Sequence, residues 1–105
     1  MICIDCQKAN GKINKLSIIG HANFAKKGKD IVCSAVSAIV IGGLNALKNP
    51  KSFEIYIDDD KGIINIESKD NVSEHDYEVL ETILIQLKTV EEEATKNVKI
   101  VEKGC

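Results

Sequence analysis

The chain has 105 residues, of which 44% are apolar and 29% are charged, and its formal net charge is −2. This length and composition predict one globular domain over residues 1–105, and the charge argues against a basic surface for nucleic acid or anionic membranes. The opening residues MICIDC lack the basic start of a signal peptide, and no apolar run is long enough to span a membrane. We therefore expect a cytoplasmic protein.

The N-terminal part of the chain predicts a β-hairpin. Apolar residues alternate with polar or mixed ones over residues 2–6, and residues 13–19 form the expected returning strand. Asn10 and Gly11 lie between these strands, and the pair favours a type I′ turn because both residue types tolerate positive φ. Gly20 ends the second strand.

A loop and a helix are expected next. Residues 20–29 carry two glycines and three lysines around one large apolar residue, Phe24, which predicts a functional loop longer than most connections. Asp30 is a favoured N-cap, and the apolar run over residues 31–47 predicts a helix that is buried on most sides. Pro50 prevents the helix from continuing further.

The C-terminal half predicts two strands, a helix and a last strand. Apolar residues alternate over 53–57 and 64–66, and Ser73 is the expected cap of the second helix. Asp76 is expected to complete a capping box by accepting a hydrogen bond from the backbone of Ser73. One stripe of this helix is apolar and comprises Tyr77, Leu80, Ile83, Leu84 and Leu87. Residues 98–100 predict the last strand.

The predicted element order is strand-strand-helix-strand-strand-helix-strand. Sheets and helices that each have one apolar side bury it by packing on one another. The order therefore predicts an α+β fold of two layers, in which two helices cover a mostly antiparallel sheet.

Cys33 and His21 carry the most reactive chemistry in the sequence. With Asp30 as N-cap, Cys33 is the third helical residue, where unpaired amides and the helix dipole favour a thiolate. His21 lies at the other end of the loop, where an imidazole is able to take the thiol proton and later protonate a leaving amine. The same first-turn amides are available to an oxyanion. These residue types also fit a less specific interpretation, namely a buried helix cysteine and a surface histidine.

Three segments resemble the signature of the ribosomal-processing cysteine protease family, Prp, of Firmicutes and related bacteria. They are Gly20-His21-Ala22, Gly28-Lys29-Asp30-Ile31-Val32-Cys33 and Ala35-Val36-Ser37-Ala38. The resemblance extends to chain length, element order and hairpin positions, so it covers essentially the whole chain.

This resemblance implies a cysteine endopeptidase with His21 as base and Cys33 as nucleophile, and with supporting roles for Asp30 and Ser37. The implied substrate is the N-terminal extension of a large-subunit ribosomal protein, number twenty-seven, which is cut after an aromatic residue. The loop implied to gate the cleft includes Gly20, Ala22, Asn23, Phe24 and Gly28. Family enzymes are typically homodimers, and we expect no metal, other cofactor, membrane or direct nucleic-acid partner.

The chain departs from the family pattern at two positions. Asn23 stands where a glycine is common, and Ser34 stands beside the nucleophile where an alanine is common. Asparagine adopts the left-handed backbone conformation more readily than most residues. These departures therefore concern substrate preference and rate rather than reaction class.

Two other function classes remain open. A noncatalytic ribosome-assembly protein would hold the same peptide in the same cleft without cutting it. A thiol redox or metal module would use Cys3 and Cys6, but residues three apart on a strand point to opposite faces, and no second pair accompanies them. The acidic run at residues 58–60 lacks the rest of a calcium-binding loop and predicts a solvated hairpin turn.

Overall fold

Alternating apolar side chains build a five-stranded sheet in the computed structural model, which describes residues 1–20 and 31–104. The strands are β1 (Ile2–Ala9), β2 (Lys12–Ile19), β3 (Phe53–Asp58), β4 (Ile63–Ser68) and β5 (Val98–Gly104). Their order is β3-β4-β2-β1-β5, and β5 pairs with β1 in parallel while the other three pairings are antiparallel. The predicted order of elements and the mostly antiparallel sheet are thus confirmed.

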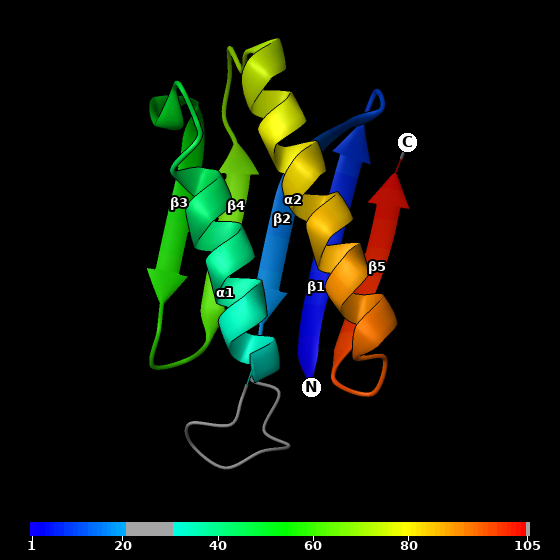
Figure 1. Cartoon of the computed structure of the whole chain (residues 1–105). Coiled ribbons are helices and arrows are strands. Elements are labelled where there is room, and N and C mark those ends of the chain that lie inside the picture. The colour runs from blue at the N-terminus through cyan, green and yellow to red at the C-terminus, as the bar shows by residue number, and fades with distance from the viewer. Residues whose placement is uncertain (21–30, 105) are drawn as a thin grey trace.

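Two helices, α1 (Ile31–Leu44) and α2 (Glu74–Glu93), lie side by side on one face of this sheet (Figure 1). A short 3₁₀ helix, η1 (Pro50–Ser52), precedes β3. The core fills the space between helices and sheet. Its most deeply buried apolar members are Ile4, Cys6, Ile13, Leu16, Val40, Ile66, Leu80, Ile83, Leu84, Leu87 and Val98.

The turn between β1 and β2 has the predicted geometry. Asn10 and Gly11 both have positive φ, at 54° and 75°. These are the values that a type I′ turn requires, and its twist matches that of the flanking strands. The turn aligns the two strands so that Cys6 lies opposite Leu16 and both side chains enter the core.

Helix α1 is shorter and more exposed than predicted. It ends at Leu44 rather than at residue 47, because the chain tightens there into turns in which the Leu47 amide donates to the Leu44 carbonyl. Only Val36 and Val40 of this helix are buried, and the Ile31 side chain is 75% exposed. In a two-layer fold the sheet covers one side of α1 and α2 flanks another. Val32, Ile39 and Leu44 are therefore only partly buried against the core, and Ile31 and Ile41 are exposed.

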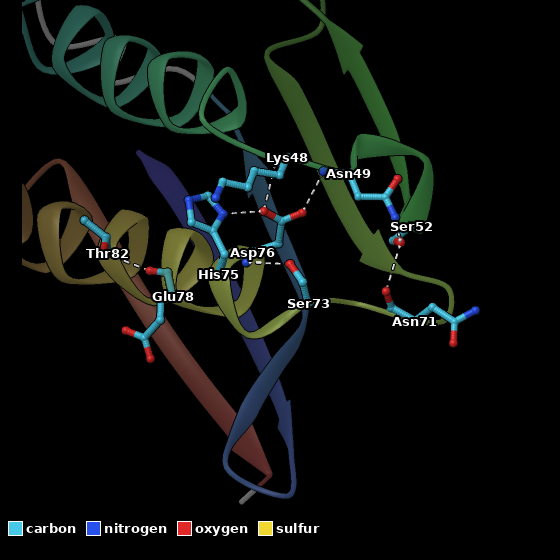
Figure 2. Close-up of polar contacts among 9 residues, drawn as sticks. All are labelled: Lys48, Asn49, Ser52, Asn71, Ser73, His75, Asp76, Glu78 and Thr82. Carbon is cyan, nitrogen blue, oxygen red and sulfur yellow. Dashed lines mark hydrogen bonds and ion pairs between the residues drawn. The ribbon is translucent and has the colours of Figure 1, made fainter.

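At the start of α2, the predicted N-cap is present but the predicted reciprocal hydrogen bond is not. Ser73 is the N-cap, and its Oγ accepts a hydrogen bond from the Asp76 amide at 3.2 Å. Asp76 does not return a bond to Ser73, which corrects the predicted capping box. Its carboxylate instead reaches the segment after α1, where Oδ1 accepts from the Lys48 amide and Oδ2 from the Asn49 amide, each at 2.9 Å (Figure 2).

The Asp76 carboxylate is therefore a buried anion that joins two parts of the chain. Its side chain is fully buried, and a third contact comes from His75 Nδ1 at 2.8 Å. Burial by itself would raise the pKa of this carboxyl, but the Lys48 amide, His75 and the Asn49 amide outweigh it and hold the pKa below its usual range. Asp76 thus remains ionised in the folded protein at neutral pH.

The two helices touch where α1 carries a glycine. A Cβ atom added at Gly43 would overlap Cγ1 and Cδ1 of Ile83, a core residue of α2 that is 1% exposed. The neighbouring Gly42 has no heavy atom within 4 Å of the same position. Gly43 is therefore the residue that permits close approach of the helices, and Gly42 is not.

We expect Gly43→Ala to lower the free energy of unfolding by about 1–3 kcal/mol, because the added methyl group overpacks the Ile83 side chain. The matched variant Gly42→Ala should leave stability unchanged or raise it by up to about 1 kcal/mol, since alanine favours the helix and meets no neighbour. Urea denaturation of both variants measures the difference. Equal effects of the two substitutions would contradict this packing.

We expect Asp76→Asn to lower the free energy of unfolding by about 2 kcal/mol at pH 7, because the hydrogen bonds from the Lys48 and Asn49 amides lose their charged acceptor. The folded pKa of Asp76 lies below its unfolded value near 3.8, so its contribution is complete above that value and is lost as pH falls. The difference in the free energy of unfolding between wild type and Asp76→Asn should therefore become progressively smaller below about pH 5.

Urea denaturation between pH 3 and pH 7 tests this dependence. Asp70→Asn is a suitable control because Asp70 is exposed, and it should change stability by less than about 0.5 kcal/mol. A gap between wild type and Asp76→Asn that stays constant with pH would contradict an ionised Asp76.

Candidate active site

Cys33 lies on the first turn of α1, as its predicted place as third helical residue requires. Its side chain is half-buried and packs against the core, while Ile31 two residues earlier projects into solvent. Val36 and Val40 fix this end of the helix on the sheet, because they are its buried residues. First-turn amides of a helix lack partners within the helix and attract anions. Helix starts of this kind are among the places where proteins hold reactive cysteines.

A cavity of about 80 Å³ opens beside Cys33. Its lining includes residues at the starts of β1 and β4 and near the start of α1. Figure 1 shows that these three starts lie at the same end of the sheet, close to the N-terminus. Its apolar lining comes from Ile2, Ile18, Val36, Ile63 and Ile64. Its other lining residues are Gly20, Cys33, Ser37, Asp58, Asp59 and Gly62. The cavity thus presents a thiol and a hydroxyl from α1 above an apolar floor contributed by three strands.

Two glycines on the cavity wall join the end of β2 to the hairpin between β3 and β4. The Gly20 amide donates to the Gly62 carbonyl at 2.9 Å, and both residues have positive φ, at 106° and 66°. A Cβ atom at Gly20 would also collide with the Met1 carbonyl oxygen. The glycine at position 20 is therefore required both by its backbone angles and by this close approach.

The hairpin turn on the far side of the cavity is held by Asp58. Its Oδ2 accepts from the Tyr56 hydroxyl and its Oδ1 accepts from the Lys61 amide, each at 3.1 Å. The hydrogen bond to Asp58 raises the pKa of Tyr56, so its hydroxyl remains a donor. Side-chain acceptance of a turn amide is a usual way for aspartate to stabilise a tight turn.

The structure brings together three of the residues singled out in the sequence. Cys33, Ser37 and Gly20 line one cavity, and Ser37 lies one helical turn beyond Cys33 as expected. The other proposed site residues lie outside the described part of the chain; they are His21, Ala22, Asn23, Phe24, Gly28 and Asp30.

Sequence reasoning missed the contribution of the β3–β4 hairpin. The acidic run at residues 58–60 predicts a solvated turn, yet Asp58 and Asp59, together with Gly62, line the cavity. The sequence predicts the turn itself, but it does not show that the turn lies beside Gly20. Pairing of β2 with β4, which brings the hairpin to Gly20, joins strands separated by more than forty residues.

The N-terminal cysteines have different surroundings. Cys6 is fully buried, whereas Cys3 is exposed on the opposite face of β1. Burial raises the pKa of the Cys6 thiol to about 11. Lys8 lowers this pKa and Glu102 raises it, each by less than burial does. Within residues 1–20 and 31–104, no group of three or more His, Cys, Asp or Glu side chains is arranged to hold a metal ion. Cys3 and Cys6 are thus not placed to share a metal ion.

No helix in the described ranges has both the length and the apolarity needed to cross a membrane.

Comparison with known proteins gives a consistent family. The family model for the cysteine protease Prp matches residues 1–99. The ribosomal processing cysteine protease Prp of Staphylococcus aureus (strain Mu50 / ATCC 700699) is 34% identical over 103 residues, which cover 95% of this chain and 97% of that protein.

Solved structures agree with this result. The crystal structure of an essential ribosomal processing protease Prp from S. aureus, in complex with a covalently linked product peptide, superposes with a TM-score of 0.88. Its sequence is 34% identical, and the match covers 98% of this chain and 100% of that one. A structure of the S. aureus protease with a substrate peptide has a TM-score of 0.84 at 33% identity and the same coverage.

We expect iodoacetamide to leave Cys6 unmodified in the folded protein while Cys3 and Cys33 react. With a pKa of about 11, Cys6 is a thiolate in only about one molecule in a thousand at pH 8, and it is fully buried. Mass mapping after labelling at pH 8 identifies the modified cysteines, and protein unfolded in urea is the control in which Cys6 should react. Labelling of folded Cys6 as fast as Cys3 would contradict its described environment.

Proposed function

The chain belongs to the cysteine protease Prp family, and on this premise we propose that it removes the N-terminal extension of a large-subunit ribosomal protein, number twenty-seven. We assign Cys33 as the nucleophile and His21 as the base. The observation that carries the assignment is the cavity, which holds Cys33 on the first turn of α1 above an apolar floor.

The surroundings of the described cysteines favour Cys33 as the nucleophile. A cysteine protease needs a thiolate that a peptide carbonyl is able to reach. Cys6 is buried and its pKa is raised, and Cys3 lies on the exposed face of β1 outside the cavity. Cys33 has a cavity beside it and helix amides around it, which support both reactivity and access.

The assignment of His21 is supported through its neighbour in the chain. Gly20 precedes His21 and lines the same cavity as Cys33, and its amide is fixed to Gly62. Histidine is the usual partner of a catalytic cysteine because its pKa lies near neutrality. We therefore propose His21 as the group that takes the Cys33 proton, with Asp30 as cap and orienting group.

The reaction then follows the general scheme of nucleophilic catalysis. The Cys33 Sγ attacks the carbonyl carbon of the scissile peptide bond, and an S–C bond forms as negative charge develops on the oxygen. First-turn amides of α1 stabilise that oxyanion. Collapse breaks the C–N bond, and His21 delivers the proton to the leaving amine. Water, deprotonated by His21, hydrolyses the thioester and regenerates the thiol.

The cavity lining also fits the proposed substrate. Its five apolar residues favour an aromatic or aliphatic side chain beside the scissile bond, because such a side chain leaves water on binding. Ser37 lies on the same helix face as Cys33, and we propose that its hydroxyl contacts the bound peptide.

We further propose that the protease works in the cytoplasm as a homodimer and that residues 1–105 form one domain. A ribosomal substrate supports the cytoplasm, and family resemblance supports the dimer. The alternative of a noncatalytic assembly protein is not retained, because the family is one of cysteine proteases.

We expect Cys33→Ala and His21→Ala each to abolish cleavage of the ribosomal precursor. Loss of the nucleophile removes the thioester pathway, and loss of the base should slow it by at least about 100-fold. Mass spectrometry of the precursor after incubation with each protein detects the shortened chain directly.

Cys3→Ala serves as the matched cysteine control and should cleave at the wild-type rate, since Cys3 lies outside the cavity. Thermal unfolding of all variants shows whether the fold is retained, and binding of the precursor peptide by Cys33→Ala shows an intact cleft. Cleavage by a folded Cys33→Ala protein at the wild-type rate would overturn the nucleophile assignment.

A further inference from the structure

We propose that Asp59 is a specificity-determining residue, and that it selects substrates with a lysine or arginine close to the scissile bond. This inference rests on the proposed peptidase function, and it concerns which peptides the cleft prefers. It follows from the position of a carboxylate on the same small cavity as Cys33.

The described residues that line the cavity carry fixed charge of only one sign. Among the described residues that line it, two are aspartates and none is lysine or arginine. The rest are apolar or neutral apart from the Cys33 thiol. Apolar walls reduce the local screening of a charge by water, so a carboxylate at such an opening attracts cations more strongly than one on an open surface.

Asp58 is already engaged in holding the hairpin. Both of its carboxylate oxygens accept hydrogen bonds, one from the Tyr56 hydroxyl and one from the Lys61 amide. Tyr56 pairs with Asn65, which lies between the buried Ile64 and Ile66 of β4 and therefore points to the sheet face away from the helices. The Asp58 carboxylate is thus held on the same face of β3 as Tyr56, with both of its oxygens engaged.

Asp59 differs from Asp58 in its partners. Within the described part of the chain its carboxylate has no hydrogen bond or ion pair, and its side chain is exposed where the turn borders the cavity. A carboxylate without a fixed partner is available to an incoming cation. Among the described residues of the cavity wall, Asp59 therefore carries a charge that a substrate is able to use.

The size of the cavity limits the distance in the substrate between the lysine or arginine and the scissile bond. About 80 Å³ accommodates roughly one side chain, so a peptide positioned on Cys33 must place its neighbouring residues at the rim. Extended peptides advance about 3.3 Å per residue, and successive side chains point to opposite sides. The cationic residue should accordingly occupy one position within about three residues of the scissile bond.

A charge scan of the substrate tests the proposal with the full-length protein. The probes are peptides spanning the cleavage region of the ribosomal precursor, with Gln, Lys or Glu placed in turn at each of three positions on either side of the cut. At one position we expect Lys to raise kcat/KM about three-fold over Gln, and about ten-fold over Glu, which is the range of a partly exposed ion pair. This preference should weaken as salt is raised from 0.05 to 0.5 M.

Variants identify the carboxylate responsible. Asp59→Asn should remove the preference for Lys at that position, and Asp59→Lys should reverse it in favour of Glu. Both effects are measured as ratios of kcat/KM among the Lys, Gln and Glu peptides with the same variant. Asp60→Asn is the matched control, because Asp60 belongs to the same exposed turn but does not line the cavity, and it should keep the wild-type preference.

The possible outcomes separate this inference from the proposed function. Cleavage of the Gln, Lys and Glu peptides at equal rates at every position would overturn the role of Asp59 and leave the peptidase assignment intact. A preference for Lys that Asp59→Asn does not change, or a loss of rate shared by all peptides, would also overturn it. Failure of wild-type protein to cut the unaltered peptide would instead contradict the proposed function.

Discussion

The buried carboxylate of Asp76 is the interaction on which the position of α1 depends. It accepts the Lys48 and Asn49 amides, so the first turn of α2 holds the segment that leaves α1 and enters β3. A fully buried anion is stable only when such donors replace water, and a displaced segment would leave both the anion and two amides unsatisfied. Together with the close helix contact at Gly43, this interaction fixes α1 near its C-terminal end and thereby sets where its first turn meets the sheet.

At the opposite end of α1, strands from both hairpins meet beneath the helix and line the cavity beside Cys33. Gly20 directly follows β2 and Gly62 directly precedes β4, and a hydrogen bond from the Gly20 amide to the Gly62 carbonyl joins these two residues at the wall of the cavity. Val36 is buried where the helix packs on this junction, and Cys33, three residues earlier in the helix, remains partly exposed. The described strands and α1 thus surround the thiol, and the sequence after Gly20 carries the histidine proposed as its base.

Cys6 and Cys33 carry the same thiol group in different surroundings. The Cys6 thiol has its pKa raised to about 11 by burial and packs as a small apolar side chain. Cys33 belongs to a helix start, where amides favour the charged form. Asp58 and Asp59 differ in a similar way. The Asp58 carboxylate accepts hydrogen bonds within the turn that it stabilises, whereas Asp59 borders the cavity with no partner among the described residues.

Local patterns in the sequence determined the elements and the helical position of Cys33, because their causes act within a few residues. Alternation predicted the strands, positive φ at Asn10 and Gly11 set the first turn, and the helix start placed Cys33 on its first turn. Tertiary structure alone decided what those elements face. The carboxylate of Asp76 turned from its own helix to the α1 connection, and Asp59 became part of the cavity wall through pairing of β2 with β4. Such contacts depend on long-range packing and strand pairing, whose energies are not encoded in the spacing of neighbouring residues.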